Sequence, residues 1–222
     1  MSAAAQIPLQ VTREQGAPLR FLRAPSNAEA AAQIADPAAW VGGRLALIGP
    51  PGSGKSLLAR EFAAAAGAEL VAAPALVGTD LAALSARGAA VQGAEDALLP
   101  QVAEALFHLH ERAAAAGRPL LLTGRTPPAR WPSPLKDLAT RLAAMPVARI
   151  GPPEPELLEA LAARLLDRRG LVVEPGLPRY LSERIERSHA ALLAAVERLD
   201  AASLAEGRRV TRALARAVLG LG

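Results

Sequence analysis

The sequence predicts an α/β fold in which a parallel sheet with helices on both faces is followed by a small all-α lid. Three observations predict it. A glycine-rich loop at residues 49–56 joins a short apolar run to a helical pattern. Apolar strands and helical patterns alternate up to residue 123, which is the order of a parallel sheet covered on both faces. Beyond residue 151 the pattern is helical, apart from a marginal strand signal at 171–173.

Composition narrows the class of protein. The 222 residues suffice for one medium domain, or for a core with a small appendage. No apolar run approaches the ~20 residues that span a bilayer, and no charged-then-apolar leader opens the chain. We therefore expect a soluble, cytoplasmic protein without a membrane partner. The lack of cysteine excludes disulfides, Cys-ligated metal sites and Cys nucleophiles.

The charge balance is less informative than the isoelectric point suggests. A value near 10.5 accompanies a net charge of only +4, because the basic residues are almost all arginine. Lys55 and Lys136 are the only lysines, and no Lys/Arg run is interleaved with aromatic residues as single-strand binding would favour. Charge alone does not establish direct nucleic-acid binding.

Residues 1–20 are polar and aperiodic, and we interpret them as a flexible arm. The arm contains an extended peptide with an amide followed by spaced apolar side chains: Gln6, Ile7, Pro8, Leu9, Gln10 and Val11. Such a peptide can dock into an apolar pocket of a partner, although a disordered terminus explains these residues equally well.

The core elements follow in order. A first helix, capped by Ser26 or Asn27, is expected to run through Ile34 and to end at Asp36-Pro37. Core strands are expected at 45–48, 69–71, 89–91 and 119–123. The helices between them are expected at 56–66, at 81–87 after a cap by Thr79 or Asp80, and at 98–116.

The remaining chain is expected to form the lid. Its helices are predicted at 156–169, at 177–187, at 190–205, and from Thr211 to Gly220. These elements divide the chain into the arm (1–20), a P-loop α/β core (21–151) and a helical lid domain (152–222).

The glycine-rich loop fits GxxxxGK[ST] at every fixed position and has the required strand before it and helix after it. Backbone N–H groups of such a loop and the helix N-terminus cradle phosphate oxygens, Lys55 adds a point charge, and the Ser56 hydroxyl can reach Mg²⁺. The predicted nucleotide-binding residues are Gly49, Pro50, Pro51, Gly52, Ser53, Gly54, Lys55, Ser56 and Leu57. We expect ADP or ATP there, with Mg²⁺ as a further candidate ligand.

The residues for hydrolysis are incomplete. A phosphate-loop hydrolase needs an acidic residue at the end of a neighbouring strand, yet the strand at 89–91 is followed by Gln92-Gly93. Glu95 and Asp96 lie further on and also suit an ordinary helix N-terminus. Arg125 follows the strand at 119–123, where it can contact phosphate or stand in a solvated turn. The sequence predicts weak or no intrinsic ATPase activity.

The histidines do not predict a metal site. His108 and His110 are two residues apart on one helix and therefore point to different faces, whereas a shared metal needs a spacing of four. His189 stands alone. We interpret all three as ordinary helix residues.

The motifs together resemble a known family. Their order is the segment 24–29, the phosphate loop, residues 104–109, Leu122 to Trp131, residues 137–142, and residues 185–191. In this order and spacing, from about residue 20 to 220, the chain resembles the AAA+ core of the replication initiator DnaA, and more closely the DnaA-like regulators of the Hda family in their alphaproteobacterial form.

The resemblance implies roles that spacing alone does not give. Arg141 matches the family's arginine finger, which acts in trans on a neighbour's nucleotide. Arg187 matches the lid arginine that contacts the nucleotide phosphates. The peptide at 6–11 resembles the one with which Hda-type proteins hold the DNA polymerase sliding clamp, although Val11 is smaller than the usual last residue.

The departures from the family matter as well. Gln92-Gly93 replace the acidic pair, and Arg125 stands where the initiator has an acidic sensor residue. The chain ends at Gly222, so we expect neither the initiator's helix-turn-helix domain nor sequence-specific DNA binding.

The resulting hypothesis is a nucleotide-binding negative regulator of replication initiation. With DnaA and the sliding clamp as partners, it would stimulate hydrolysis of the ATP bound to DnaA. Two alternatives stay open: an active AAA+ ATPase such as a helicase loader, in which Glu95 or Asp96 serves the metal, and an adaptor that helps initiation. A small-molecule kinase is disfavoured because the lid offers no evident second-substrate site.

Overall fold

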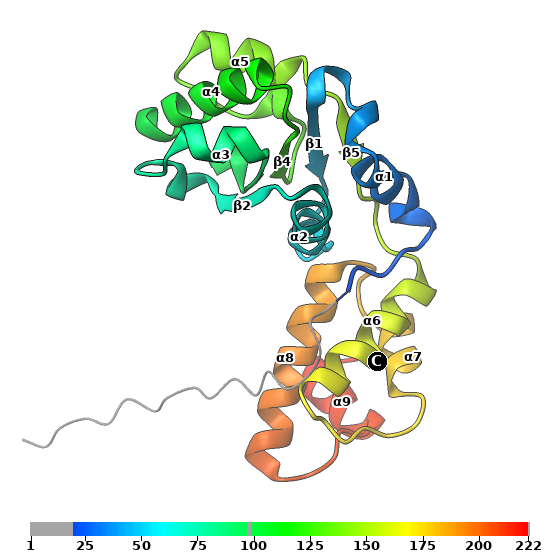
Figure 1. The fold of residues 1–222 in the computed structure, drawn as a ribbon. Coiled ribbons are helices and arrows are strands. Elements are labelled where there is room, and N and C mark those ends of the chain that lie inside the picture. The colour runs from blue at the N-terminus through cyan, green and yellow to red at the C-terminus, as the bar shows by residue number, and fades with distance from the viewer. Residues whose placement is uncertain (1–19, 97–98, 222) are drawn as a thin grey trace, which may run out of the picture.

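A five-stranded parallel sheet forms the centre of the larger half of the molecule (Figure 1). This computed structural model describes residues 20–96 and 99–221. The strand order is β2-β3-β4-β1-β5. The strands are β1 (Arg44–Ile48), β2 (Glu69–Ala72), β3 (Ala89–Gln92), β4 (Leu120–Gly124) and β5 (Val147–Arg149). The predicted α/β fold with a parallel sheet is confirmed.

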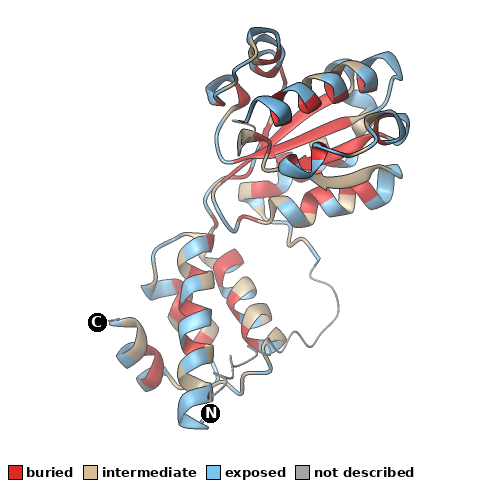
Figure 2. Ribbon diagram, turned by 90° about the vertical axis from the view of Figure 1, so that its left-hand side faces the viewer, coloured by how far each residue is buried: buried red, intermediate tan, exposed pale blue. Residues whose placement is uncertain are grey.

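Helices cover both faces of the sheet, and alternate strand residues point to each. The helices are α1 (Pro25–Ala35), α2 (Lys55–Ala66), α3 (Leu81–Arg87), α4 (Pro100–Ala115) and α5 (Lys136–Ala143). On β4, Leu120 and Leu122 belong to the cluster with α3, α4 and α5, whereas Leu121 belongs to the cluster with α1 and α2. Figure 2 shows the resulting pattern of buried strands and helices with one buried face.

A smaller helical region follows the sheet. Its helices are α6 (Pro155–Arg168), α7 (Leu177–Arg184), α8 (His189–Glu206) and α9 (Arg212–Leu219). They share a cluster of buried leucines, valines and alanines that begins at Leu158. The marginal strand signal at 171–173 corresponds only to an isolated bridge between Val173 and Val210.

Several predicted boundaries were wrong. The helix expected at 177–187 ends at Arg184, because Ile185 is extended and Ser188 starts α8 as its N-cap. The N-cap of α1 is Ala24, so neither Ser26 nor Asn27 stands at the N-cap position. Instead, Asn27 accepts a hydrogen bond from the Ala24 N–H at 2.9 Å.

Strand β5 was missed altogether. It has only three residues and lies at the sheet edge beside β1, and its last residue, Arg149, is exposed. A strand this short carries no readable alternation of apolar and polar residues. Two predicted caps are confirmed: Asp80 caps α3 and Thr211 caps α9. Over the described ranges, no helix is both long and apolar enough to cross a membrane.

Candidate nucleotide site

The phosphate loop lies where the carboxyl end of β1 meets the N-terminus of α2. Gly52 and Gly54 have φ values of 75° and 88°, which only glycine adopts readily, and Gly54 is the N-cap of α2. Lys55 and Ser56 therefore occupy the first turn of this helix, and Ser56 is exposed. The loop has the backbone conformation and the helix terminus that an anionic phosphate requires.

Lys55 is folded onto the loop. Its Nζ donates to the carbonyl oxygens of Gly49 at 2.8 Å and Pro50 at 2.9 Å. Burial lowers the pKa of Lys55; Glu95 opposes this shift and Arg125 adds to it. A phosphate beside the loop would give this partly buried ammonium an anionic partner.

The lid region packs directly on the loop. A Cβ at Gly52 would lie 2.8 Å from Leu193 Cδ1 and 3.2 Å from His189 Cβ, so the start of α8 approaches the loop as closely as a glycine allows. On the other side, a Cβ at Gly54 would lie 2.8 Å from the Phe21 ring. The loop thus lies between α8 and the segment that precedes α1.

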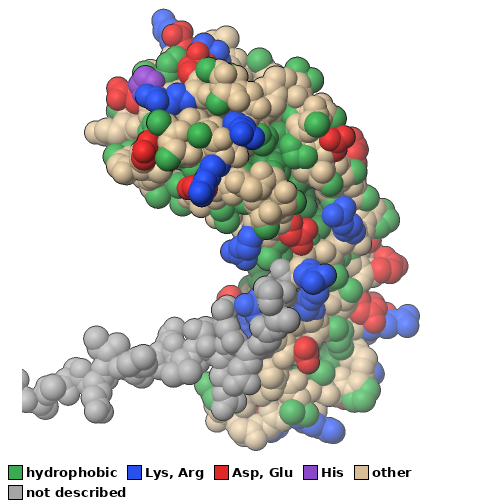
Figure 3. All heavy atoms as spheres, in the orientation of Figure 1, with side chains coloured by type: hydrophobic (Ala, Val, Ile, Leu, Met, Phe, Trp, Pro, Cys, Tyr) green, Lys and Arg blue, Asp and Glu red, His purple; other side chains and the backbone are tan. Residues whose placement is uncertain are grey.

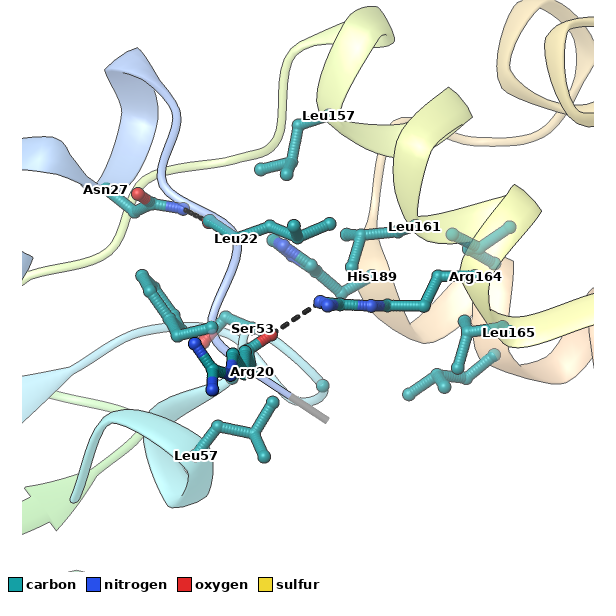
Figure 4. Close-up of a pocket in the computed structure, with 15 residues that line it drawn as sticks. Arg20, Leu22, Asn27, Ser53, Leu57, Leu157, Leu161, Arg164, Leu165 and His189 are labelled. Carbon is teal, nitrogen blue, oxygen red and sulfur yellow. Dashed lines mark hydrogen bonds between the residues drawn. The ribbon is translucent and has the colours of Figure 1, made fainter. Parts of the chain in front are cut away.

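A cavity opens beside the loop, bounded by residues 20–22, the loop, α6 and α8 (Figure 4). Leu157, Leu161 and Leu165 of α6 give it an apolar wall, and Phe21 also lines it. Arg164 of α6 donates to the Arg20 carbonyl at 2.6 Å, which joins the lid to the segment before α1. Apolar walls beside a phosphate loop suit the flat base of a nucleotide.

Two buried polar atoms at this cavity lack hydrogen-bond partners. They are Ser53 Oγ and His189 Nδ1, in residues that are 3% and 4% exposed. Such atoms are rare in folded proteins and call for a ligand or water. Lys and Arg side chains also gather at the waist between the sheet and the lid in the space-filling view (Figure 3). The residues present fit a nucleotide phosphate chain.

The residues near the end of β3, where an active hydrolase holds its metal ion with a carboxylate, differ from those of such an enzyme. Gln92, at the end of β3, has a buried Nε2 with no partner in the described chain. The Glu95 carboxylate accepts from the Arg125 N–H at 2.8 Å and from Arg125 Nε at 2.5 Å. Arg125 therefore does not simply stand in a solvated turn, because it is hydrogen-bonded to Glu95. Among the described residues, no cluster of three acidic or histidine side chains is placed to hold a metal.

Arg141 lies at the opposite edge of the sheet. It is near the end of α5, which leads to the start of β5, whereas the phosphate loop follows the end of the parallel neighbour β1. Its Nη1 and Nη2 lie 3.0 and 3.1 Å from the two oxygens of Glu111 on α4, and its guanidinium stands 5.5 Å from the Phe107 ring centroid. The side chain remains 41% exposed. Arg141 is fixed in direction but accessible.

Two other predicted residues are not brought to the cavity by the described structure. Arg187 is exposed in the turn between α7 and α8, and it makes no hydrogen bond or ion pair to the described part of the chain. The peptide at 6–11 lies outside the described residues.

Sequence reasoning missed two residues that join the sheet to the lid. His189 is a lid residue that meets the loop, and not the ordinary helix residue that the sequence predicts. Glu154, just before α6, accepts hydrogen bonds from the Ser26 N–H and from Ser26 Oγ, the latter at 2.8 Å. The only sequence signal was the position of each: His189 directly after a capping serine, and Glu154 at the change of pattern near residue 151.

Two family models match the chain. The model described as "AAA domain" matches residues 45–174, and the model described as "Hda, lid domain" matches residues 154–219. The first spans the phosphate loop and the sheet, and the second spans α6 to α9. The resemblance stated from the sequence is confirmed.

Solved structures give the same fold. Domain III of the Thermotoga maritima replication initiation protein DnaA aligns with a TM-score of 0.73 and 16% identity over 90% of this chain and 93% of that one. A replication initiator DnaA bound to AMPPCP and single-stranded DNA aligns at 0.62 and 11% identity over 85% and 66%. The Thermotoga maritima branch migration motor RuvB aligns at 0.57 and 19% identity over 80% and 61%.

Proposed function

The chain belongs to the AAA domain family, and on that premise we propose that it is a nucleotide-binding regulator of chromosomal replication initiation. In this proposal it acts with the DNA-loaded sliding clamp to stimulate hydrolysis of the ATP held by DnaA, and so restrains initiation. The Hda-type lid match and the DnaA-like fold support the process. The positions of Arg141, Gln92 and Glu95 support the role of a regulator that acts on the ATP of a partner.

The bound ligand in this proposal is ADP or ATP. The loop N–H groups, Lys55 and the N-terminus of α2 would hold the phosphates, and the apolar wall of α6 would face the base. Ser56 would supply a hydroxyl to Mg²⁺, whose charge would neutralise part of the phosphate chain. A similar fold is known with the ATP analogue AMPPCP, in a replication initiator DnaA.

The observation that carries the proposal is the position of Arg141. A parallel strand of five residues separates the edge that holds the phosphate loop from the edge at which α5 ends. At about 3.3 Å per residue, this is a separation of roughly 16 Å. In this proposal Arg141 serves a nucleotide on another molecule and not its own, and its contacts with Glu111 hold the guanidinium in place. An arginine supplied in trans stabilises the charge on the transferring phosphoryl group.

The nucleotide of this chain is not turned over efficiently in the proposed scheme. Glu95, the described acid nearest to the end of β3 in sequence, is engaged by Arg125, and Gln92 offers an amide where a hydrolase presents a carboxylate. The alternative is an active ATPase that uses Glu95 or Asp96. Steady-state ATP turnover by the protein alone, lost in Glu95→Ala, would favour that alternative.

The proposed tether is the peptide at 6–11. Its amide and spaced apolar residues suit an apolar pocket on the clamp. Deletion of residues 6–11 should abolish binding to immobilised clamp in surface plasmon resonance, whereas Lys55→Ala should bind it normally. Equal affinity of the deleted and full chains would remove the clamp from the scheme.

The direct test reconstitutes the reaction. DnaA loaded with radiolabelled ATP is mixed with DNA-loaded clamp and with this protein in its ADP form. Conversion of the label to ADP should require both the clamp and this protein. Conversion at the same rate without either component contradicts the proposal. Depletion in cells, followed by counting of origins, separates restraint, which raises the origin number, from assistance, which lowers it.

A further inference from the structure

His189 occupies a special position in the fold. It is the first residue of the 18-residue helix α8, after the capping Ser188, and its Cβ lies against Gly52 of the phosphate loop. It is 4% exposed and lines the cavity together with Ser53. In Figure 4 its ring points from the lid into the space beside Leu22 and the loop.

The ring has an unmet hydrogen-bonding capacity. Nδ1 is enclosed and has no partner in the described chain, and the same holds for Ser53 Oγ on the loop side of the cavity. Ser188, by contrast, is committed to the cap, since its Oγ accepts from the Ala191 N–H at 3.1 Å. Two residues that line one cavity, one from the core and one from the lid, therefore each hold a buried polar atom without a partner in the described chain.

The charges around the ring are mostly positive. Lys55 approaches from α2, Arg164 lines the cavity from α6, Arg20 lines it from the segment before α1, and Glu154 stands before α6. Burial lowers the pKa of His189, Lys55 lowers it further, and Glu154 opposes them. In the absence of an anion the imidazole is therefore neutral at neutral pH.

We propose that His189 is the lid-side ligand of the nucleotide's phosphate chain and that it takes up a proton when the nucleotide binds. This rests on the proposed nucleotide binding and adds to it the residue that couples the lid to the phosphates. Arg187, exposed in the preceding turn, is not needed for this contact.

The proton balance is simple. Free protein carries the neutral ring. The phosphate oxygens bring negative charge next to Lys55 and His189, and the ring takes one proton from buffer, so that Nδ1–H and Nε2–H are both present. The charged ring then donates a hydrogen bond to a phosphate oxygen. A positive charge at the N-terminus of α8 is unfavourable by itself, and the negative charge of the phosphate offsets this. Because the bound form holds the extra proton, nucleotide affinity should rise as pH falls.

The first experiment needs no variant. Long-range ¹H–¹⁵N spectra follow the three histidines of the full chain over pH, with and without saturating ADP. The pKa of His189 should rise on ADP binding. His110, which is also buried but lies on α4 near Arg141, and exposed His108 are internal controls and should not move. An unchanged His189 titration with ADP bound overturns the inference.

The second experiment uses His189→Asn, with His108→Asn as the matched control. Titration calorimetry in buffers of different ionisation enthalpy counts the protons taken up with ADP. At pH 7.5 the parent and His108→Asn should each take up a fraction of a proton per ADP bound. Their ADP affinity should fall between pH 6 and 8 by up to roughly tenfold per pH unit. His189→Asn should bind ADP with less uptake and a flatter profile, leaving only the titration of the nucleotide itself.

The outcomes separate this inference from the function beneath it. ADP binding with the same proton uptake in His189→Asn overturns the role of His189 and leaves nucleotide binding intact. No ADP or ATP binding to the parent chain overturns both. Thermal unfolding of both variants without nucleotide checks that each is folded. If His189→Asn does not fold, the titration of His189 in the parent chain, with and without ADP, still tests the inference.

Discussion

Gly52 is a phosphate-loop residue on which the lid packs closely. It combines a φ of 75° with a neighbouring lid side chain, so both its backbone conformation and its lack of a Cβ are used. Gly67 ends α2 with a similar φ of 64° but has no atom within 4 Å of a built Cβ. Substitution of alanine at each of these two glycines therefore separates the effect of backbone strain on stability from the effect of displacing the lid.

Gly52→Ala should weaken ADP binding and destabilise the protein, because the new methyl group meets Leu193 and His189. Backbone strain adds about 1 kcal/mol at either glycine. Gly67→Ala should show only that strain, with ADP affinity unchanged. Urea unfolding and ADP titration measure the two effects. Equal ADP affinities for the two variants would mean that the lid does not bear on the loop in solution.

Lys55 is the cation that the phosphate loop offers. A hydrogen bond to a charged group contributes about 1.5–3 kcal/mol, so Lys55→Ala should lower ADP affinity by about ten- to hundredfold. Lys136→Ala, at the start of α5, removes the other lysine and should leave the affinity unchanged. Titration calorimetry compares them. Equal affinity of Lys55→Ala and the parent would contradict phosphate binding at this loop.

At the scale of elements, the carboxylate of Glu154 joins the start of α1 to the start of α6. Burial raises the pKa of Glu154, but hydrogen bonds from its own N–H and from Ser26 outweigh that, and the pKa is lowered overall. A lowered folded pKa means that this stabilisation is present above the unfolded pKa of about 4.3 and is lost as the pH falls through the folded value.

Glu154→Gln should therefore destabilise the protein at pH 7 by about 1 kcal/mol, and the difference from the parent should shrink below about pH 4. Glu186→Gln is the control, since Glu186 is exposed in the turn before α8 and its side chain has no hydrogen bond in the described structure. Urea unfolding at a series of pH values follows both. A constant difference at every pH would show that the charge of Glu154 is not involved.

Some elements could be predicted from the sequence and others could not. The phosphate loop, β4 and the lid helices were predicted because each has either a fixed motif or a long apolar period. The edge strand β5 is too short for a period, and the caps of α1 were mistaken because Ser26 is used by Glu154, 128 residues away. Contacts of that range, including that of His189 with Gly52, leave no local pattern in a single sequence.

The whole molecule presents a different feature at each of the two ends of its parallel strands. At the carboxyl edge of the sheet, the loop, the segment before α1 and the lid line the cavity that we assign to the nucleotide. At the amino edge, Glu111 holds an accessible Arg141. In the account proposed here, the first end fixes the lid against the core and the second acts on a partner's ATP.

The ion pair between Arg141 and Glu111 is partly exposed, so its loss should cost no more than about 1 kcal/mol of stability. Arg141→Ala can therefore be compared with the parent as a folded protein. Arg112→Ala is its matched control, because Arg112 is an exposed arginine beside Glu111 on the same helix.

The most direct measurement is the rate at which labelled ATP on DnaA is converted to ADP by the parent, Arg141→Ala and Arg112→Ala proteins with DNA-loaded clamp. We predict full stimulation by the parent and by Arg112→Ala, and a loss of about 10³-fold or more, down to the unstimulated rate, with Arg141→Ala. Stimulation by Arg141→Ala equal to that of the parent would contradict it.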